Sequence, residues 1–419
     1  MSSQVVLHNP LVVGVDSHRQ SNVVRLLDRH GHVIGKPLHI HNNRPGIAVL
    51  AQQLQTVVQQ GRYDGIQLAT EATNWYWLGM FCSLSQTQPE PLQLYAFNPR
   101  LTANFKKALW QDDHTDVADA LVIAERLRMG RDLPPPFQTD TLYQPLRLLT
   151  RCRFHFVRML VREKAYALNL IYLKASAYTA PGKQPFSDVF GATSRAVLTE
   201  FASCADILAW PLEQLAEWLD QRGKRRFADP SATARKLQVV ARESFVLPSA
   251  FQAPVNLALG MALRQIVSLE QQIQRLDAPI AERLQVIPNT LTTIPGIGPV
   301  CCAGIIAELG DIHRFNGDDD KVAKFAGFKW RRHQSANFEA EDTPLTLHCN
   351  RYLRYYFCEA ANLVRIHEPE YAAFYQKKYA EATKHPHKRA IVLTARKLVR
   401  LVTRLLTTNQ PYRARRTKA

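Results

Sequence analysis

Four carboxylates in the first part of the 419-residue chain have residue types and spacing that suit metal-dependent chemistry. Asp16 ends the apolar run "LVVGVD", and Glu71 ends the similar run "GIQLATE". Asp116 and Asp119 lie three residues apart, so on a helix they project from one face. Burying a lone carboxylate is costly unless it is paired, hydrogen-bonded or bound to a cation. Converging carboxylates would repel one another unless cations lay between them, and oxygen ligands suit Mg²⁺ or Mn²⁺.

Such a site would act on phosphate esters. Two ions about 4 Å apart polarise a phosphate and activate an attacking oxygen. The structural alternative is that Asp16 caps a turn, while Asp116 and Asp119 are the acidic residues common in the first turn of a helix. Each carboxylate alone is a weak signal, and their order on successive elements favours the metal site. Asp112 and Asp113 leave the register open, because Asp112 and Asp116 would share a helix face almost as well.

A sheet and a helix are needed to position these carboxylates. Three short β-type runs come first, then helix, strand, helix and strand, then two helical segments, at 11–16, 22–28, 32–40, 44–61, 65–71, 74–84, 92–97, 99–110 and 115–130. This order indicates a mixed sheet covered on both faces, as in a ribonuclease H-like (RuvC-like) fold. In that sheet the strands that carry Asp16 and Glu71 are neighbours, so we expect their carboxylates to meet at one edge.

Beyond a proline-rich break at 132–140 the sequence becomes helical. Long helices are predicted over 143–178 and about 255–286, and they flank a helical insert at about 185–250. The two helices indicate an antiparallel pair or an arm that dimerises. An ordinary internal bundle is an alternative of nearly equal weight, because the heptad pattern is too imperfect to name an oligomer. We therefore expect a multidomain protein with a RuvC-like α/β domain, a coiled-coil-like helical middle, a mainly α-helical C-terminal domain and a basic tail, over 1–135, 140–287, 288–408 and 409–419.

The third region opens on a glycine-containing turn that could hold a phosphate. In "IPGIGPVCCAGIIAEL", Pro295 and Gly296 permit a tight turn, and Gly298 lets a phosphate approach the N–H groups at a helix start. This is the helix-hairpin-helix pattern, a sequence-independent grip on nucleic acid. A plain corner between two helices is the alternative of equal weight.

The composition favours a folded protein that binds polyanions. Hydrophobic residues make up 46% of the chain and charged residues 21%, and the formal charge is +17. Such an excess attracts nucleic-acid phosphates, with a merely solvated basic surface or acidic lipid as the alternatives. We find no apolar run of membrane-spanning length, no signal peptide and no CxxC spacing among the seven cysteines. We therefore expect a cytoplasmic protein without a membrane partner, a disulfide framework or a zinc module.

The second half contains several short motifs in a characteristic order. After the glycine-containing turn come "FAGF", the basic aromatic run "KWRR", "HQSA" and "NRYLR". Together with "GVDSH", "ATEATNWYW" and "TDVADA" in the first half, they resemble the Piv/MooV-type DEDD transposases, the insertion-sequence one-ten group. We assign nucleic-acid contacts to the glycine-containing turn and to four further residues, Arg331, Arg332, Asn350 and Arg354.

The resemblance implies a transposase that excises and inserts its own element, guided by a structured bridge RNA. By motif, Asp16, Glu71, Asp116 and Asp119 would bind the metal, and Ser335 would attack a DNA phosphate and hold the strand covalently. It also implies donor and target double-stranded DNA as substrates, and a homodimer or homotetramer that brings tetrad and serine together. Two positions depart from the family's usual glycines, Ala336 after the serine and Cys349 before Asn350, and both affect turn geometry rather than a reacting group.

Three other functions stay open at this point. A structure-selective nuclease or Holliday-junction resolvase would use the same carboxylates with water as nucleophile, and it would leave Ser335 without a role. An actin-like sugar kinase can share the pattern of the first strand, but the chain lacks the Gly- and Thr-rich phosphate loops expected of one. A non-catalytic nucleic-acid-binding protein would show no metal-dependent activity.

Overall fold

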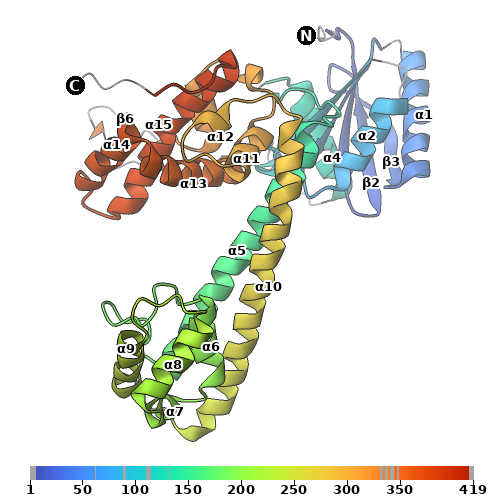
Figure 1. The fold of residues 1–419 in the computed structure, drawn as a ribbon. Coiled ribbons are helices and arrows are strands. Elements are labelled where there is room, and N and C mark those ends of the chain that lie inside the picture. Colours follow the sequence, from blue (N-terminus) through green and yellow to red (C-terminus); the bar gives the residue numbers. More distant parts are fainter. Residues whose placement is uncertain are drawn as a thin grey trace. The chain divides into compact units, whose positions relative to one another are not determined.

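The computed structural model describes most of the chain. The described residues are 6–61, 63–87, 91–109, 115–131, 133–330, 334–335, 338–339, 344–346 and 349–414. Asp112 and Asp113, which left the register of the acidic helix open, lie outside them. The chain forms two compact units, Met1–Asp140 and Thr141–Ala419 (Figure 1).

The first unit is built on a five-stranded mixed sheet in the order β3-β2-β1-β4-β5. Its strands are β1 (Leu11–Ser17), β2 (Ser21–Leu27), β3 (Val33–His41), β4 (Ile66–Glu71) and β5 (Leu92–Phe97). The first three strands pair antiparallel, whereas β1 with β4 and β4 with β5 pair parallel. The predicted mixed α/β sheet is therefore confirmed.

Helices cover both faces of this sheet, and strand β1 shows why. Its side chains alternate: Leu11, Val13 and Val15 pack with α1 (Arg44–Gly61) and α2 (Tyr76–Thr87). Val12 faces the other way and packs with α4 (Asp116–Arg128). Because both faces are buried, the strand reads as a continuous apolar run rather than an alternating one. Helix α3 (Pro99–Ala108) connects β5 to the segment before α4.

The second unit begins with two long helices, α5 (Tyr143–Lys174) and α10 (Gln252–Gln285). Polar contacts join Arg153 to Asp277 at 2.8 Å, Lys164 to Glu270 at 2.8 Å and Lys174 to Asn256 at 2.7 Å. As residue numbers rise along α5 they fall along α10, so the helices are antiparallel (Figure 1). The two predicted long helices are confirmed, although α5 ends at Lys174 rather than near residue 178.

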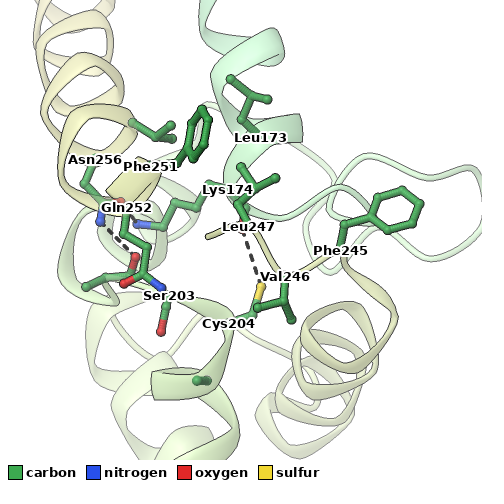
Figure 2. Close-up of a pocket in the computed structure, with 13 residues that line it drawn as sticks. Leu173, Lys174, Ser203, Cys204, Phe245, Val246, Leu247, Phe251, Gln252 and Asn256 are labelled. Carbon is green, nitrogen blue, oxygen red and sulfur yellow. Dashed lines mark hydrogen bonds between the residues drawn. The ribbon is translucent and has the colours of Figure 1, made fainter. Parts of the chain in front are cut away.

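The insert forms a small helical bundle at the far end of this pair. It contains α6 (Ala192–Glu200), α7 (Cys204–Ala209), α8 (Leu212–Arg222) and α9 (Pro230–Glu243). A pocket of about 80 Å³ lies here, and Figure 2 shows Lys174 beside Phe251 and Cys204 beside Val246. Lys174 Nζ donates to Leu198 O and Asn256 Oδ1, and burial lowers its pKa to about 8.

The remainder of the second unit is a mainly helical C-terminal part. Its helices are α11 (Pro299–Leu309), α12 (Asp319–Ala326), α13 (Arg351–His367), α14 (Pro369–Ala380) and α15 (Pro386–Thr408). Helix α11 is buried along most of its length, and it packs with α5, α10 and α13. Among the described residues, no helix is long and apolar enough to cross a membrane.

Helix α4 approaches strand β1 closely at Gly14. A Cβ atom at this position would overlap the Ala120 carbonyl oxygen and lie 2.5 Å from the Ala124 nitrogen, both in α4. Only glycine therefore lets α4 approach β1 this closely. Since Asp16 follows Gly14 on the strand and Asp116 begins the helix, this contact also sets the separation of the two acidic residues.

We expect Gly14→Ala to destabilise the first unit by about 1–3 kcal/mol, the usual cost of overpacking a well-packed core. Gly79→Ala is the matched control, because nothing lies within 4 Å of its Cβ position inside α2. There alanine should be neutral or stabilising, as is usual within a helix. Hydrogen exchange of β1 and α4 in the full chain measures the difference. Equal protection in both variants would contradict the close-contact explanation.

Candidate active site

The candidate site lies at the carboxyl ends of the two central strands of the first unit. β1 and β4 run parallel, and their register pairs Val15 with Thr70. Asp16 and Glu71 are the next residue of each strand, just beyond the last pair that β1 and β4 form with each other, and each still pairs with its other neighbouring strand. The neighbouring placement of these two strands was predicted from the sequence, and it is confirmed.

Helix α4 brings further acidic residues to this edge. Thr115 caps the helix by accepting a hydrogen bond from the Ala118 N–H at 3.2 Å, so Asp116 and Asp119 both lie in the first turn. The N-terminal end of a helix carries partial positive charge, which favours acidic side chains there. The side chain of Asp116 is more than half exposed, whereas that of Asp16 is 18% exposed.

His18 joins the two carboxylates. Its Nε2 lies 3.1 Å from Asp16 Oδ2 and 3.5 Å from Asp116 Oδ2. One ligand atom from each of these three side chains lies within 4.8 Å of the other two. Two carboxylate oxygens in such a group fit a hard divalent cation such as Mg²⁺ or Mn²⁺, and an imidazole nitrogen fits the softer transition metals as well.

The other two members of the expected tetrad have different partners. Asp119 Oδ1 lies 2.5 Å from Lys106 Nζ of α3, whose side chain is only 13% exposed. Glu71 Oε2 accepts a hydrogen bond from Thr73 at 3.3 Å. The structure therefore brings ligand atoms of Asp16, His18 and Asp116 within 4.8 Å of one another. Asp119 lies near enough for its charge to act on the Asp16 carboxyl, although its own contact is with Lys106.

Electrostatics single out Asp16 within the cluster. Burial raises the pKa of the Asp16 carboxyl, and the charges of Asp119 and Asp116 raise it further, while His18 acts in the opposite direction. The ionised form of Asp16 is therefore costly in this surrounding. A cation among the carboxylates would remove that cost.

His18 and Lys106 were not predicted from the sequence as residues of the site. His18 could have been predicted, because a residue two positions after Asp16 in an extended strand points to the same side of the sheet. No comparable signal existed for Lys106, since its contact with Asp119 depends on how α3 packs against α4.

Ser335 lies on a short hairpin of the second unit, between α12 and α13. The backbones of β6 (Gln334–Ser335) and β7 (Phe338–Glu339) pair antiparallel, with Ser335 opposite Phe338. Nearer the root of the hairpin, Trp330 pairs with Leu345. Arg331, Arg332 and Ala336 lie outside the described residues.

Asn350 and Arg354 fix the second end of this hairpin. Asn350 Oδ1 caps α13 by accepting from the N–H groups of Tyr352 and Leu353, and its Nδ2 donates to Glu308 at 2.7 Å. Arg354 Nη2 donates to the carbonyls of Gly327 and Thr346 at 2.8 and 2.7 Å. Both side chains hold the protein's own backbone or side chains, and their contact with nucleic acid stays a prediction.

Glu308 is a buried charge of α11 that is paired with Arg151 of α5. Its side chain is 1% exposed, and both oxygens accept from the Arg151 guanidinium, at 2.7 and 2.8 Å. Removing one partner of such a pair costs about 3–5 kcal/mol. Through Asn350, the pair links α5 and α11 to the start of α13.

In the glycine-containing turn, Gly296 packs closely against another helix, whereas the space around Gly298 is open. Gly296 has φ +91°, and a Cβ there would lie 2.8 Å from the Leu363 carbonyl carbon of α13. Gly298 is the N-cap residue just before α11, and nothing lies within 4 Å of its Cβ position. A 3-10 turn, η2 (Leu291–Thr293), precedes these residues where the motif would have a full helix, so the helix-hairpin-helix stays a prediction.

Comparisons with known proteins agree with this arrangement. Residues 13–172 match a family model for DEDD transposases of the IS110 group, described as "Transposase". Residues 289–376 match a second model, described as "Transposase IS116/IS110/IS902 family". Together the two matches cover more than half of the chain.

Two curated proteins are similar over most of their length. The chain is 26% identical over 315 residues to the insertion element IS116 uncharacterized 44.8 kDa protein of Streptomyces clavuligerus, covering 73% of this chain and 75% of that protein. It is 23% identical over 318 residues to the insertion element IS900 uncharacterized 42 kDa protein of Mycobacterium paratuberculosis, covering 73% and 74%. With its α/β unit and both family matches, the chain belongs to the IS116/IS110/IS902 family of transposases.

Proposed function

We propose that this transposase cleaves and rejoins DNA strands with a metal-binding acidic site and a serine nucleophile, guided by a bridge RNA. The observation that carries the proposal is the group of Asp16, His18 and Asp116 at the end of a buried strand. The proposed partners are donor and target double-stranded DNA, a structured guide RNA and further copies of the chain in a homodimer or homotetramer. The sugar-kinase alternative is set aside, because the family match is to transposases.

In this proposal Asp16 and Asp116 bind Mg²⁺ or Mn²⁺, and each is held in place by a different element. Asp16 is fixed by its buried strand, and Asp116 by the capped first turn of α4. His18 contacts both carboxylates and orients them, and we assign Glu71 and Asp119 to the edge of the same site. The bound ion would stabilise the negative charge that develops on the phosphate.

Ser335 supplies the attacking oxygen in this proposal. A bond forms between Ser335 Oγ and the phosphorus as the bond from phosphorus to one deoxyribose oxygen breaks. The proton of the serine hydroxyl ends on that leaving oxygen, so the strand is held as a phosphoester. Attack by a new deoxyribose hydroxyl reverses these steps and rejoins the strand. The support is the place of Ser335 on the short hairpin between α12 and α13, together with the motif "HQSA". A serine hydroxyl needs activation by a base or a metal ion.

The basic charge of the chain supports the nucleic-acid partners. The formal charge is +17, and α15 places basic residues along much of its length. Each phosphate that a basic side chain neutralises releases counterions, so binding becomes strongly salt-dependent. We assign Gly298, Arg331 and Arg332 to this contact.

Removal of a metal ligand should abolish cleavage and leave DNA binding nearly intact. We expect no detectable strand cleavage from Asp16→Asn, Glu71→Gln or Asp119→Asn with Mg²⁺ or Mn²⁺, whereas Asp112→Asn should cleave far more than Asp116→Asn. His18→Ala should raise the metal concentration needed for half-maximal cleavage by about 10–100-fold, the usual effect of removing a group that orients metal ligands. A cleavage assay on labelled donor DNA over a metal titration measures these effects. Retained cleavage in Asp16→Asn would contradict the metal site.

Ser335→Ala should eliminate the covalent intermediate. Wild-type protein incubated with metal ion, guide RNA and donor DNA is expected to form an adduct that survives denaturation, and the variant should form none while it still binds RNA. Gel electrophoresis of labelled DNA under denaturing conditions detects the adduct. Cleavage at the wild-type rate by Ser335→Ala would identify water as the nucleophile, which is the resolvase chemistry.

The guide RNA should be required for recombination. We expect strand exchange between donor and target only when the RNA encoded beside the gene is present, and a change in its pairing segment should redirect insertion. Sequencing of insertion junctions with matched and altered RNA measures this. Equal insertion without the RNA would contradict the proposal that an RNA guides recombination.

A further inference from the structure

A cavity lies at the root of the hairpin that carries Ser335. Its volume is about 290 Å³, near the lower end for pockets that hold small organic ligands. The lining residues are Trp330, Leu345, Lys388, Arg389, Val392 and Leu393. Two come from the first cross-strand pair of the hairpin, and four come from the first turns of α15.

The lining combines an aromatic wall with basic residues. Trp330 offers an indole face, while Leu345, Val392 and Leu393 add apolar surface. Lys388 and Arg389 are exposed and lie near the N-terminal end of a 23-residue helix, where the first N–H groups carry partial positive charge. A planar ring joined to a phosphate fits this combination, because nucleobases stack on aromatic side chains and basic residues bind the backbone.

The sequence places this cavity close to the proposed point of strand exchange. Trp330 precedes Ser335 by five residues, which span at most about 18 Å when fully extended. Phosphates along one strand of B-DNA repeat every ~3.4 Å of helix axis. A nucleotide in the cavity would therefore lie within about five positions of the phosphate bound to Ser335.

We propose that this cavity holds one unpaired DNA base beside the exchange site, stacked on Trp330, with its phosphate on Lys388 and Arg389. A base must leave its duplex to enter a protein pocket, and strand exchange requires the bases near the cut to lose their first partners. Held there, the base fixes the strand relative to the Ser335 hairpin. Trp330 is thus a positioning residue, and this proposal rests on the proposed function of Ser335.

A fluorescent adenine analogue, 2-aminopurine, tests the stacking directly. It is placed in turn at each of the five positions on either side of the cleavage site in donor DNA, and the full-length protein is added with guide RNA. We expect stacking to quench the fluorescence at one position with wild-type protein and with Trp330→Phe, and not with Trp330→Leu. Trp210→Leu, which changes a partly exposed tryptophan of the insert bundle, should keep the quenching.

The basic residues give a second readout. Lys388→Gln and Arg389→Gln should each lower the slope of DNA affinity against salt by about one ion, and Lys236→Gln, an exposed lysine of α9, should leave the slope unchanged. Trp330→Leu should slow strand exchange roughly tenfold, within the range found for loss of one stacked base. An unchanged rate and slope in these variants would overturn the assignment.

The two proposals fail in distinguishable ways. Ser335→Ala should keep the quenching, because stacking needs no covalent step. Wild-type protein that forms the adduct but quenches the analogue at no position would overturn the base pocket and leave the nucleophile intact. Quenching lost in Trp330→Leu only when the analogue is in the guide RNA would assign the cavity to RNA and overturn its assignment to DNA.

Discussion

The close approach of α4 to β1 at Gly14 is the constraint on which the candidate site depends. A side chain at this position would overlap the helix backbone. Because Gly14 has no Cβ, the strand that bears Asp16 and the helix that begins at Asp116 can pack in direct contact. Packing energy from the apolar residues of both elements then opposes the repulsion between the two carboxylates. His18 offsets part of that repulsion, and a divalent cation would offset the rest.

In the second unit, the hairpin that carries Ser335 forms a two-stranded sheet of its own in the part of the chain that the structure describes. Two paired residues on each side stabilise little by themselves. At the root of the hairpin, Arg354 donates to the carbonyls of Thr346 and Gly327, and Asn350 connects the start of α13 to the buried Glu308 and its partner in α5.

Much of the fold could be predicted because it follows local rules. The continuous apolar run of β1 identifies it as a strand, and the helical spacing of apolar residues in α1 identifies it as a helix. Short connections and the crossovers between parallel strands restrict the order of the strands in the sheet. The side-chain partners could not be predicted in the same way. Lys106 meets Asp119, and Glu308 meets Arg151, through the packing of separate helices, and no periodic pattern encodes that packing. The end of α5 was misplaced for a similar reason, since Ala175 and Tyr178 pack into the insert bundle instead of continuing the helix.

Mn²⁺ binding measures directly, without any reaction, whether Asp16 and Asp116, oriented by His18, hold a divalent cation. Titration of the full-length protein with Mn²⁺, followed by the electron paramagnetic resonance signal of the free ion, should show uptake by the wild-type chain. The same titration should show that uptake removed in Asp16→Asn and preserved in Asp112→Asn. Equal uptake by wild type and Asp16→Asn, or none by wild type, would contradict the account.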